Sequence, residues 1–362
     1  MIMDGRLYIG PLKMRLICAL ALFSSVLNVV GENLSDREHL DAIHAQHKID
    51  EAIAKGLDYL VSQQDPATGQ FSSGKMPNTY TALSCIALMA AGQFPGQSKY
   101  GDNLYRGIMY LTRKSKDHKG YYGNEGNARM YGHGICALAL CEAYGMMEKE
   151  ADNLKIKNAI EAALKIILHS QSDKDANQRG GWRYEPRPND SDLSVTVWQM
   201  LTLRSAQNCQ LDVPDKAIEL SLDYVRRCYS SSQQGFSYQA PGKNATPAMR
   251  TAGVVALQAL GARHEERDKK MLEQSSSFLK TFDPRRASHY WYTAYYLATA
   301  ANMMSDELRE TFLPRLEKTL IELQKDNGEF LKHSGHDGGV YSTAFGVICL
   351  CVHYQYLPIY QE

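Results

Sequence analysis

Hydrophobic and polar positions divide this chain into two kinds of helical segment. One kind is amphipathic, with apolar residues on one face and Glu, Lys and Arg on the other, as in residues 49–63, 217–228 and 312–324. The other kind is apolar almost all round and rich in Ala, Leu, Val and Cys, as in residues 80–92, 131–144, 195–206, 251–261 and 340–352. Helices of the second kind need cover on every side, so the pattern predicts apolar inner helices surrounded by amphipathic outer ones.

A recurring glycine and aromatic residue joins the two kinds of segment. The pairs are Gly69/Phe71, Gly120/Tyr121, Gly181/Trp182, Gly235/Phe236 and Gly328/Phe330. The gaps between the glycines are 51, 61, 54 and 93 residues, and the last gap spans two units, with a copy that lacks the glycine near residues 286–291. Such a period indicates stacked hairpins. The expected fold is therefore all-α, a closed double ring of about six helical hairpins. Its parallel inner helices are expected to point their N-termini, and the loops before them, at one shared rim.

The N-terminal stretch follows a different pattern. Lys13 and Arg15 precede an apolar run over residues 16–30 that ends in small residues. This arrangement is typical of a secretory signal peptide, with an uncleaved anchor as the alternative. We therefore expect an exported protein without a stable membrane span after cleavage. Its parts are a signal peptide over residues 1–31, a linker over 32–48 and one repeat domain over 49–362.

Composition narrows the range of partners. The chain carries 40 basic and 40 acidic side chains without a basic cluster, which argues against nucleic acid as a partner. Seven cysteines follow the apolar leader, and most lie in apolar helical segments, where cysteine packs as a small hydrophobe. This odd number indicates no disulfide framework, and Cys209 with Cys228 is the pair to test.

Spacing near the C-terminus points to a family. Gln324 to Phe330 reads Gln-x-x-x-Gly-x-aromatic, and Gln64 to Phe71 is a looser copy with one extra residue. This spacing resembles the QW repeat of squalene–hopene and oxidosqualene cyclases. The chain from Ile49 onward is similar to the terpenoid cyclase and protein prenyltransferase family. The resemblance implies an α/α toroid whose chemistry lies at the loop-rich rim and in a central cavity, although one fold carries several functions.

One acidic segment matches the family's chemistry in part. Class II cyclases protonate their substrate with the middle Asp of Asp-x-Asp-Asp, and this chain reads Asp190-Ser191-Asp192-Leu193. The resemblance makes Asp192 the candidate catalytic acid, although Leu193 replaces the last aspartate. Prenyltransferases hold zinc through Asp, Cys and His, but hydroxyls stand at two of these positions, Ser194 and Ser342. We therefore predict neither a metal site nor another cofactor.

Asp192 also has a structural interpretation, as the N-cap of the inner helix that follows it. Thr246 before Pro247 is the same kind of signal, a cap residue followed by proline. Further cap candidates are Thr79, Ser288 and Ser342.

Several rim residues are candidates for binding a ligand. They are Tyr131, His133, Arg250, His289, Trp291, Tyr292 and Tyr341. His133 lies between two glycines that leave room for a close approach, and the alternative is a core histidine bonded to a carbonyl. Arg250 opens a helix, where a cation needs an acidic partner or an anionic ligand. Asp192 is the expected partner of Arg250, and this pairing would lower the pKa of the Asp192 carboxyl.

The remaining candidates are aromatic or metal-binding in character. His289, Trp291 and Tyr292 belong to an aromatic run that can line a pocket or form ordinary core. His333, His336 and Asp337 have ligand-like spacing in a glycine-rich loop, but a third partner is not specified.

Three functions remain open. The first is an exported, divergent cyclase-like protein that binds or acts on an isoprenoid-like or other apolar small molecule in its central cavity. The second is a scaffold without catalysis that holds a protein or peptide at the rim. The third is a carbohydrate-active toroid, which needs two carboxylates facing each other across a cleft, with Glu125 and Asp337 as candidates. A filled centre would favour the scaffold, and an apolar cavity would favour a lipid ligand.

Overall fold

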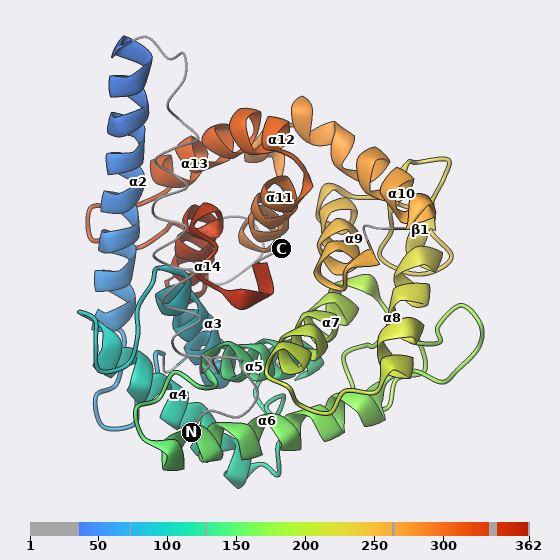
Figure 1. Cartoon of the computed structure of the whole chain (residues 1–362), viewed down its shortest axis with the longest axis horizontal. Helices are drawn as coiled ribbons and strands as arrows, with labels where there is room; N and C mark the ends of the chain where they lie inside the picture. Colours follow the sequence, from blue (N-terminus) through green and yellow to red (C-terminus); the bar gives the residue numbers. More distant parts are fainter. Residues whose placement is uncertain (1–35, 73, 127–128, 263–264, 333–338, 361–362) are drawn as a thin grey trace, which may run out of the picture.

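The computed structural model describes residues 36–72, 74–126, 129–262, 265–332 and 339–360, and their helices form two concentric rings (Figure 1). The inner ring consists of α3 (Pro77–Ala90), α5 (Arg129–Ala143), α7 (Leu193–Asn208), α9 (Pro247–Ala259), α11 (Tyr290–Met304) and α14 (Val340–Leu350). The outer ring consists of α2 (Asp36–Ser62), α4 (Gly101–Asp117), α6 (Glu150–Ser170), α8 (Asp215–Cys228), α10 (Glu266–Ser276), α12 (Asp306–Thr311) and α13 (Leu313–Glu322). Smaller elements are the strands β1 (Tyr229–Ser230) and β2 (Gly235–Phe236) and the 3-10 turns η2 (Ser277–Lys280), η3 (Pro284–Arg286), η4 (Val352–Tyr354) and η5 (Pro358–Tyr360).

The inner ring is closed. Each inner helix packs against the inner helices before and after it, and α14 packs against α3. Outer helices lie between two inner ones, as α4 does on α3 and α5. This confirms the all-α toroid. Helix α2 begins at Asp36, within the residues 32–48 that were expected to form a linker, and the predicted signal peptide lies outside the described residues.

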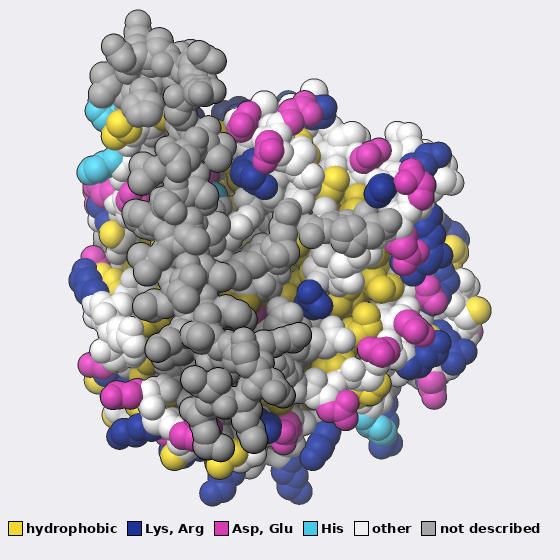
Figure 2. Space-filling model, viewed as in Figure 1, with side chains coloured by type: hydrophobic (Ala, Val, Ile, Leu, Met, Phe, Trp, Pro, Cys, Tyr) yellow, Lys and Arg dark blue, Asp and Glu magenta, His cyan; other side chains and the backbone are white. Residues whose placement is uncertain are grey.

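The two rings differ in surface character as the sequence pattern requires. Along α3 and α7 almost every side chain is buried, whereas α4 and α8 bury one face. Charged side chains accordingly lie mainly around the edge of the face in Figure 2, and hydrophobic ones are exposed nearer its middle. Within the described residues, no helix combines the length and apolar character needed to cross a membrane.

The recurring glycine allows each loop to lie against the backbone of the next outer helix. Gly69, Gly180 and Gly328 have positive φ values of 82°, 91° and 86°. A Cβ at these positions would lie 2.3, 2.0 and 2.0 Å from backbone oxygens of α4, α8 and α2, so a larger residue cannot fit. The contact of Gly328 with α2 brings the last repeat onto the first.

The structure corrects the register of two glycine–aromatic pairs. In the third copy the left-handed glycine against the next helix is Gly180, and not the adjacent Gly181. In the second copy the fully buried aromatic residue is Tyr122, whereas Tyr121 is half-buried. Four of the five pairs therefore have the spacing Gly-x-aromatic, and in the remaining pair Gln234, with a φ of 50°, stands two residues before Phe236.

A glutamine fixes the same junction. The side-chain amides of Gln64, Gln171 and Gln324 donate to the carbonyls of Gly69, Gly180 and Gly328 at 3.0, 3.0 and 3.1 Å. Each amide also donates to a carbonyl at the next outer helix, at 2.9, 2.9 and 2.8 Å. The glutamine of the repeat therefore joins neighbouring hairpins.

Aromatic side chains pack the centre of the ring. Trp198 on α7 stacks on Tyr295 of α11 with ring centroids 5.2 Å apart, and its ring lies 6.5 Å from Phe345 of α14, on the opposite side of the ring. All three side chains are buried. The C-terminal segment buries Leu357 and Ile359, with η4 against α11 and η5 against α7.

Two further sequence expectations are tested by the packing. Asp192 and Thr246 are N-caps as predicted, but Thr79, Ser288 and Ser342 are not the cap residues of α3, α11 and α14. The seven cysteines that the structure describes are all free, and six are buried. Cys209 donates to the carbonyl of Cys141 at 3.2 Å rather than pairing with Cys228.

Candidate functional site

The N-termini of α3, α5 and α7 each contact the loop that precedes the next inner helix, which brings these ends together at one mouth. The Glu125 carboxylate accepts from the backbone N–H groups of Asn78 and Thr79 at 2.7 and 2.8 Å. The N–H of Met130 donates to the Tyr184 carbonyl at 3.0 Å, and that of Leu193 to the Tyr238 carbonyl at 2.8 Å. The shared rim expected from the sequence is present, and Glu125 is engaged in capping α3.

Asp192 is buried at the start of α7, with both carboxylate oxygens occupied. Oδ1 accepts from the Val195 N–H at 2.8 Å and from Ser194 Oγ at 2.5 Å. Oδ2 accepts from Nη1 of Arg183 at 3.0 Å. The N-cap interpretation is confirmed, and the side chain has no exposed surface.

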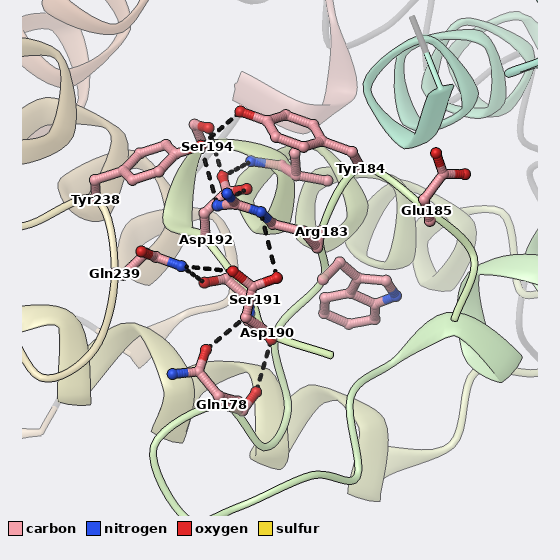
Figure 3. A network of polar contacts seen from close by, with 12 residues as sticks. Gln178, Arg183, Tyr184, Glu185, Asp190, Ser191, Asp192, Ser194, Tyr238 and Gln239 are labelled. Atoms are coloured by element: carbon pink, nitrogen blue, oxygen red, sulfur yellow. Dashed lines mark hydrogen bonds and ion pairs between the residues drawn. The ribbon is translucent and has the colours of Figure 1, made fainter. Parts of the chain in front are cut away.

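Arg183 is the centre of the polar network in Figure 3. Its Nη1 also donates to the Tyr238 hydroxyl at 3.1 Å, and its Nε lies 3.4 Å from Oδ1 of Asp190. The guanidinium carbon lies 4.6 and 5.4 Å from the ring centroids of Tyr184 and Tyr238, whose hydroxyls are 2.6 Å apart. Asp192 is thus held between a helix N-terminus and a cation that contacts two tyrosine rings.

These surroundings act on the Asp192 carboxyl in opposite directions. Burial raises its pKa above the ordinary aspartate value, while the bonds from Ser194, Val195 and Arg183 lower it. A general acid must present a proton to substrate. The Asp192 oxygens instead accept bonds from the protein itself, so this geometry stabilises the fold rather than delivering a proton.

Half-buried tyrosines surround this network at the mouth. The hydroxyl of Tyr131 donates to Ser194, which extends the chain of hydrogen bonds from Asp192 to the mouth. The Tyr131 ring lies 6.0 Å from that of Tyr184 and 6.3 Å from that of Tyr292. Tyr341 lies half-buried on α14, 5.0 Å from the Phe345 ring that belongs to the packed centre. The mouth therefore combines aromatic faces with hydroxyl groups.

Arg250 does not pair with Asp192, which corrects the predicted ion pair. Its guanidinium donates to the carbonyls of Gln233, Gln234 and Ala245 at 2.6, 3.0 and 3.2 Å. It therefore caps a loop, because three carbonyl oxygens supply the negative partial charge that a carboxylate was expected to supply. Burial lowers the pKa of Arg250.

His133 lies between α5 and α6 and is a core histidine, as the alternative interpretation expected. Its Nδ1 accepts from the Tyr122 N–H at 3.4 Å, and its Nε2 lies 3.2 Å from the Ala163 carbonyl oxygen. The space left by Gly134 is filled by α7, since a Cβ there would lie 2.6 Å from Nε2 of Gln199. Both imidazole nitrogens of His133 are engaged by the backbone.

The other aromatic candidates divide between core and rim. Trp291 is buried, with its indole N–H donating to the Leu331 carbonyl at 3.0 Å and its ring 5.4 Å from Phe330. His289 is exposed and precedes α11 with a left-handed φ of 47°. Tyr292 is half-buried beside Tyr131. The structure thus brings Asp192, Tyr131 and Tyr292 together and places His133, Trp291 and Arg250 in structural contacts.

Sequence reasoning missed the role of Arg183 and the two tyrosines around it. The Gly-Gly-Trp-Arg-Tyr segment reads as a hairpin junction, and Tyr238 comes from the loop of the next repeat. The sequence signal for this role was Arg183 itself, a cation seven residues before Asp190 that could pair with the Asp190–Asp192 segment. No group of three or more metal-binding side chains occurs in the part of the chain described, and His333, His336 and Asp337 lie outside it.

Comparisons with known proteins point to the same fold. A sequence profile of the prenyltransferase alpha-alpha toroid domain matches residues 33–177, 174–281 and 273–361. Curated protein sequences give no match.

Solved structures of similar shape have low sequence identity to this chain. The GH76A α-1,6-mannanase of Salegentibacter sp. HEL1_6 is 11% identical with a TM-score of 0.62, over 85% of this chain and 99% of that one. The type II terpene cyclase MstE of Scytonema is 14% identical with a TM-score of 0.56, over 86% and 99%. A D-mannose isomerase is 13% identical with a TM-score of 0.59, over 85% and 96%. At such identities the likeness extends to the fold alone.

Proposed function

Because this chain belongs to the prenyltransferase alpha-alpha toroid family, whose fold serves several chemistries, we propose that it is an exported binding toroid. It holds a segment of another protein at its tyrosine-lined mouth and does not catalyse a reaction there. The observation that carries the proposal is the state of Asp192. Its carboxylate is fully buried and bonded to Val195, Ser194 and Arg183.

The other described carboxylates of the mouth also have partners within the protein. Glu125 caps α3, while Asp190 and Glu185 form partly exposed ion pairs with Arg183 and Arg129. Acid–base catalysis needs a carboxyl group within reach of a bound substrate, and glycoside hydrolysis needs two. These engagements favour binding over catalysis.

The packed centre argues against an isoprenoid-like ligand. Such a ligand needs an apolar chamber of several hundred cubic ångströms. Here Trp198, Tyr295 and Phe345 meet across the ring and are buried by one another. The proposal therefore places the ligand at the mouth and not in the middle of the ring.

The chemistry of the mouth suits a protein segment. Tyrosine and arginine are enriched where proteins bind one another, because they offer large rigid faces together with hydrogen-bonding groups. Tyr131, Tyr184 and Tyr292 are half-buried with rings 6.0 and 6.3 Å apart, so they present partly exposed faces in a fixed arrangement.

Selection of a displayed random-peptide library on the purified protein tests the proposal. Selected peptides should lose at least about tenfold in affinity for a Tyr184→Ala, Tyr292→Ala double variant, as truncation of an aromatic hot spot does. Tyr356→Ala is the matched control, since Tyr356 is 41% exposed on the C-terminal segment. Peptides that bind all three proteins equally, or no enrichment over repeated rounds, would refute a mouth that recognises protein.

A second candidate is an oligosaccharide ligand in the same mouth. Tyrosine rings beside Arg183 and Asp190 offer the stacking faces and charged hydrogen-bonding groups that sugars also use. A mannanase and a D-mannose isomerase are among the proteins of similar shape. A glycan array with the same two variants separates this candidate from the first, and release of reducing sugar from any array hit would contradict the absence of catalysis.

A further inference from the structure

Two adjacent hollows lie on the outer ring, on α4 and beside the loop of residues 65–69. One has a volume of about 310 Å³ and is lined by Arg106 and Arg113 of α4, Lys155 of α6, Tyr105 and Thr68, among others. The other, of about 470 Å³, shares the Ala67–Thr68 wall and Arg113 and adds Lys114, Lys116 and the carboxylate of Asp117. Both hollows are therefore lined by cations and share one wall.

The charge of the hollows is unbalanced, although the whole chain has equal numbers of acidic and basic side chains. Two of the cations have carboxylate partners: Lys155 lies 2.7 Å from Asp152 and Lys114 lies 3.8 Å from Asp117. Among the described residues, Arg106, Arg113 and Lys116 have no carboxylate within ion-pair distance. The cations therefore outnumber the carboxylates, and the region keeps a net positive potential.

Arg106 is the most informative of these cations. Its Nε is buried without a hydrogen-bond partner in the described structure, and its Nη2 makes only a long bond of 3.4 Å to Oε1 of Gln64. A buried donor without a partner is costly and calls for an explanation. Arg113, by contrast, donates to the Thr68 carbonyl and is fixed at the wall between the hollows. The first hollow thus has one committed and one largely uncommitted guanidinium.

We propose that this pair of hollows is a binding site for a phosphate group carried by a small organic molecule. A guanidinium donates two parallel hydrogen bonds to a phosphate, and an ammonium adds a point charge. The guanidinium groups of Arg106 and Arg113 supply donors, Lys155 supplies charge, and Tyr105 borders the remainder of the ligand. The cavity volume leaves room for a group larger than phosphate itself. The site lies on the outer ring, so it is separate from the mouth and independent of the function proposed there.

Titration calorimetry with glycerol 3-phosphate at constant ionic strength tests the site. The wild-type protein is expected to bind saturably, and Arg106→Gln is expected to weaken binding by about tenfold or more, the loss of one charge-assisted bond. Lys157→Gln is the control for loss of a nearby positive charge, because Lys157 lies on α6 with Lys155 but pairs with Glu161 outside the hollows. Arg113→Gln serves as a second test if Arg106→Gln does not fold.

Two further arms identify the source of the phosphate. Sodium sulfate at the same ionic strength measures the preference for a dianion in general, and vesicles of phosphatidylglycerol in phosphatidylcholine present the group as a lipid headgroup. Binding of either phosphate source that Arg106→Gln weakens and Lys157→Gln does not supports the site. Absence of saturable binding to every probe, or equal affinity in wild type and all variants, would overturn it.

Discussion

Protonation of His133 gives a sharp test of the core between α5 and α6. The imidazole is completely buried, and burial lowers its pKa from 6.5 to about 4. Its neutral form accepts from the Tyr122 N–H and faces the Ala163 carbonyl, whereas a protonated ring would lose the first of these bonds. Folding therefore excludes a proton that the unfolded chain takes up below pH 6.5.

The magnitude follows from linkage between protonation and folding. Because the folded pKa is the lower one, the unfolded state binds more protons between pH 6.5 and pH 4, and stability is lost as pH falls through this range. With these two values, the His133 contribution falls by about 1.8 kcal/mol between pH 7 and pH 5. Its limit at still lower pH is about 3.4 kcal/mol, from 1.36 kcal/mol for each unit of the difference.

The raw pH profile of the protein cannot reveal this contribution alone. Burial also raises the pKa of Glu317 to about 7, and a raised carboxyl pKa gives stability that is present at low pH and lost as pH rises. The two contributions oppose one another between pH 5 and pH 7. A difference profile against a variant that changes only His133 separates them.

His133→Gln is that variant, because its amide can accept from the Tyr122 N–H and donate to the Ala163 carbonyl without titrating. Urea unfolding, followed by the fluorescence of the buried tryptophans, should show the wild type losing about 1.8 kcal/mol more than the variant between pH 7 and pH 5. Equal losses in the two proteins would show that His133 is solvated or charged in the folded state, and the core assignment would fail.

Three other predictions concern the ring, the mouth and the thiols. Gly328→Ala should cost at least about 2 kcal/mol of unfolding free energy, because its Cβ would meet a backbone oxygen of α2. Gly145→Ala, at a similar φ but with open space around it, should cost about 1 kcal/mol. Equal losses would contradict ring closure at Gly328. Asp192→Ala should cost about 3–5 kcal/mol of unfolding free energy, because it removes a cap and leaves Arg183 without its buried partner. Asp192→Asn should cost less, because it keeps the cap. Denaturant unfolding measures both variants, and near-neutral substitutions would refute the network. N-Ethylmaleimide should modify Cys209 alone among the described cysteines of the native protein, since the other six are buried. Peptide mapping by mass spectrometry identifies the labelled cysteines. Rapid labelling of any buried cysteine would contradict this prediction.

The sequence predicts the ring because the periodicity of its apolar residues and glycines follows from how the helices pack. Helices that are apolar all round can only lie inside others, and a glycine repeated every fifty or so residues marks a backbone contact that recurs once per hairpin. The register within a repeat was harder to predict, because Gly180 and Gly181 are adjacent and only one has positive φ. Similarly, Tyr121 and Tyr122 are chemically alike, and only the fold shows which one is buried.

The role of His133 illustrates what a single repeat cannot reveal. In three other copies a threonine hydroxyl accepts the backbone N–H of the buried aromatic residue: Thr81 from Phe71, Thr196 from Trp182 and Thr343 from Phe330, at 3.0, 3.0 and 3.1 Å. His133 accepts the equivalent N–H of Tyr122. Aligning the copies on the inner helices would have shown a histidine at a threonine position, which indicates an acceptor within the core rather than a ligand-binding group.

The proposal that Asp192 is not a catalytic acid follows from its place in the toroid. The position at which the resemblance places a cyclase's proton donor is the N-cap of α7 in this chain, and the two roles need different contacts. A cap needs a side-chain oxygen that accepts bonds from N–H groups, whereas a proton donor needs a protonated carboxyl that faces the substrate. In this chain Arg183 and Ser194 also donate to Asp192, and the next residue, Leu193, is buried where the cyclase pattern has another aspartate. Leu193 removes the adjacent aspartate whose charge would favour the protonated form of Asp192, and the charge of Asp190 is offset by Nε of Arg183 at 3.4 Å. The contacts that make Asp192 a cap therefore support the proposal that a ligand meets the tyrosines of the mouth.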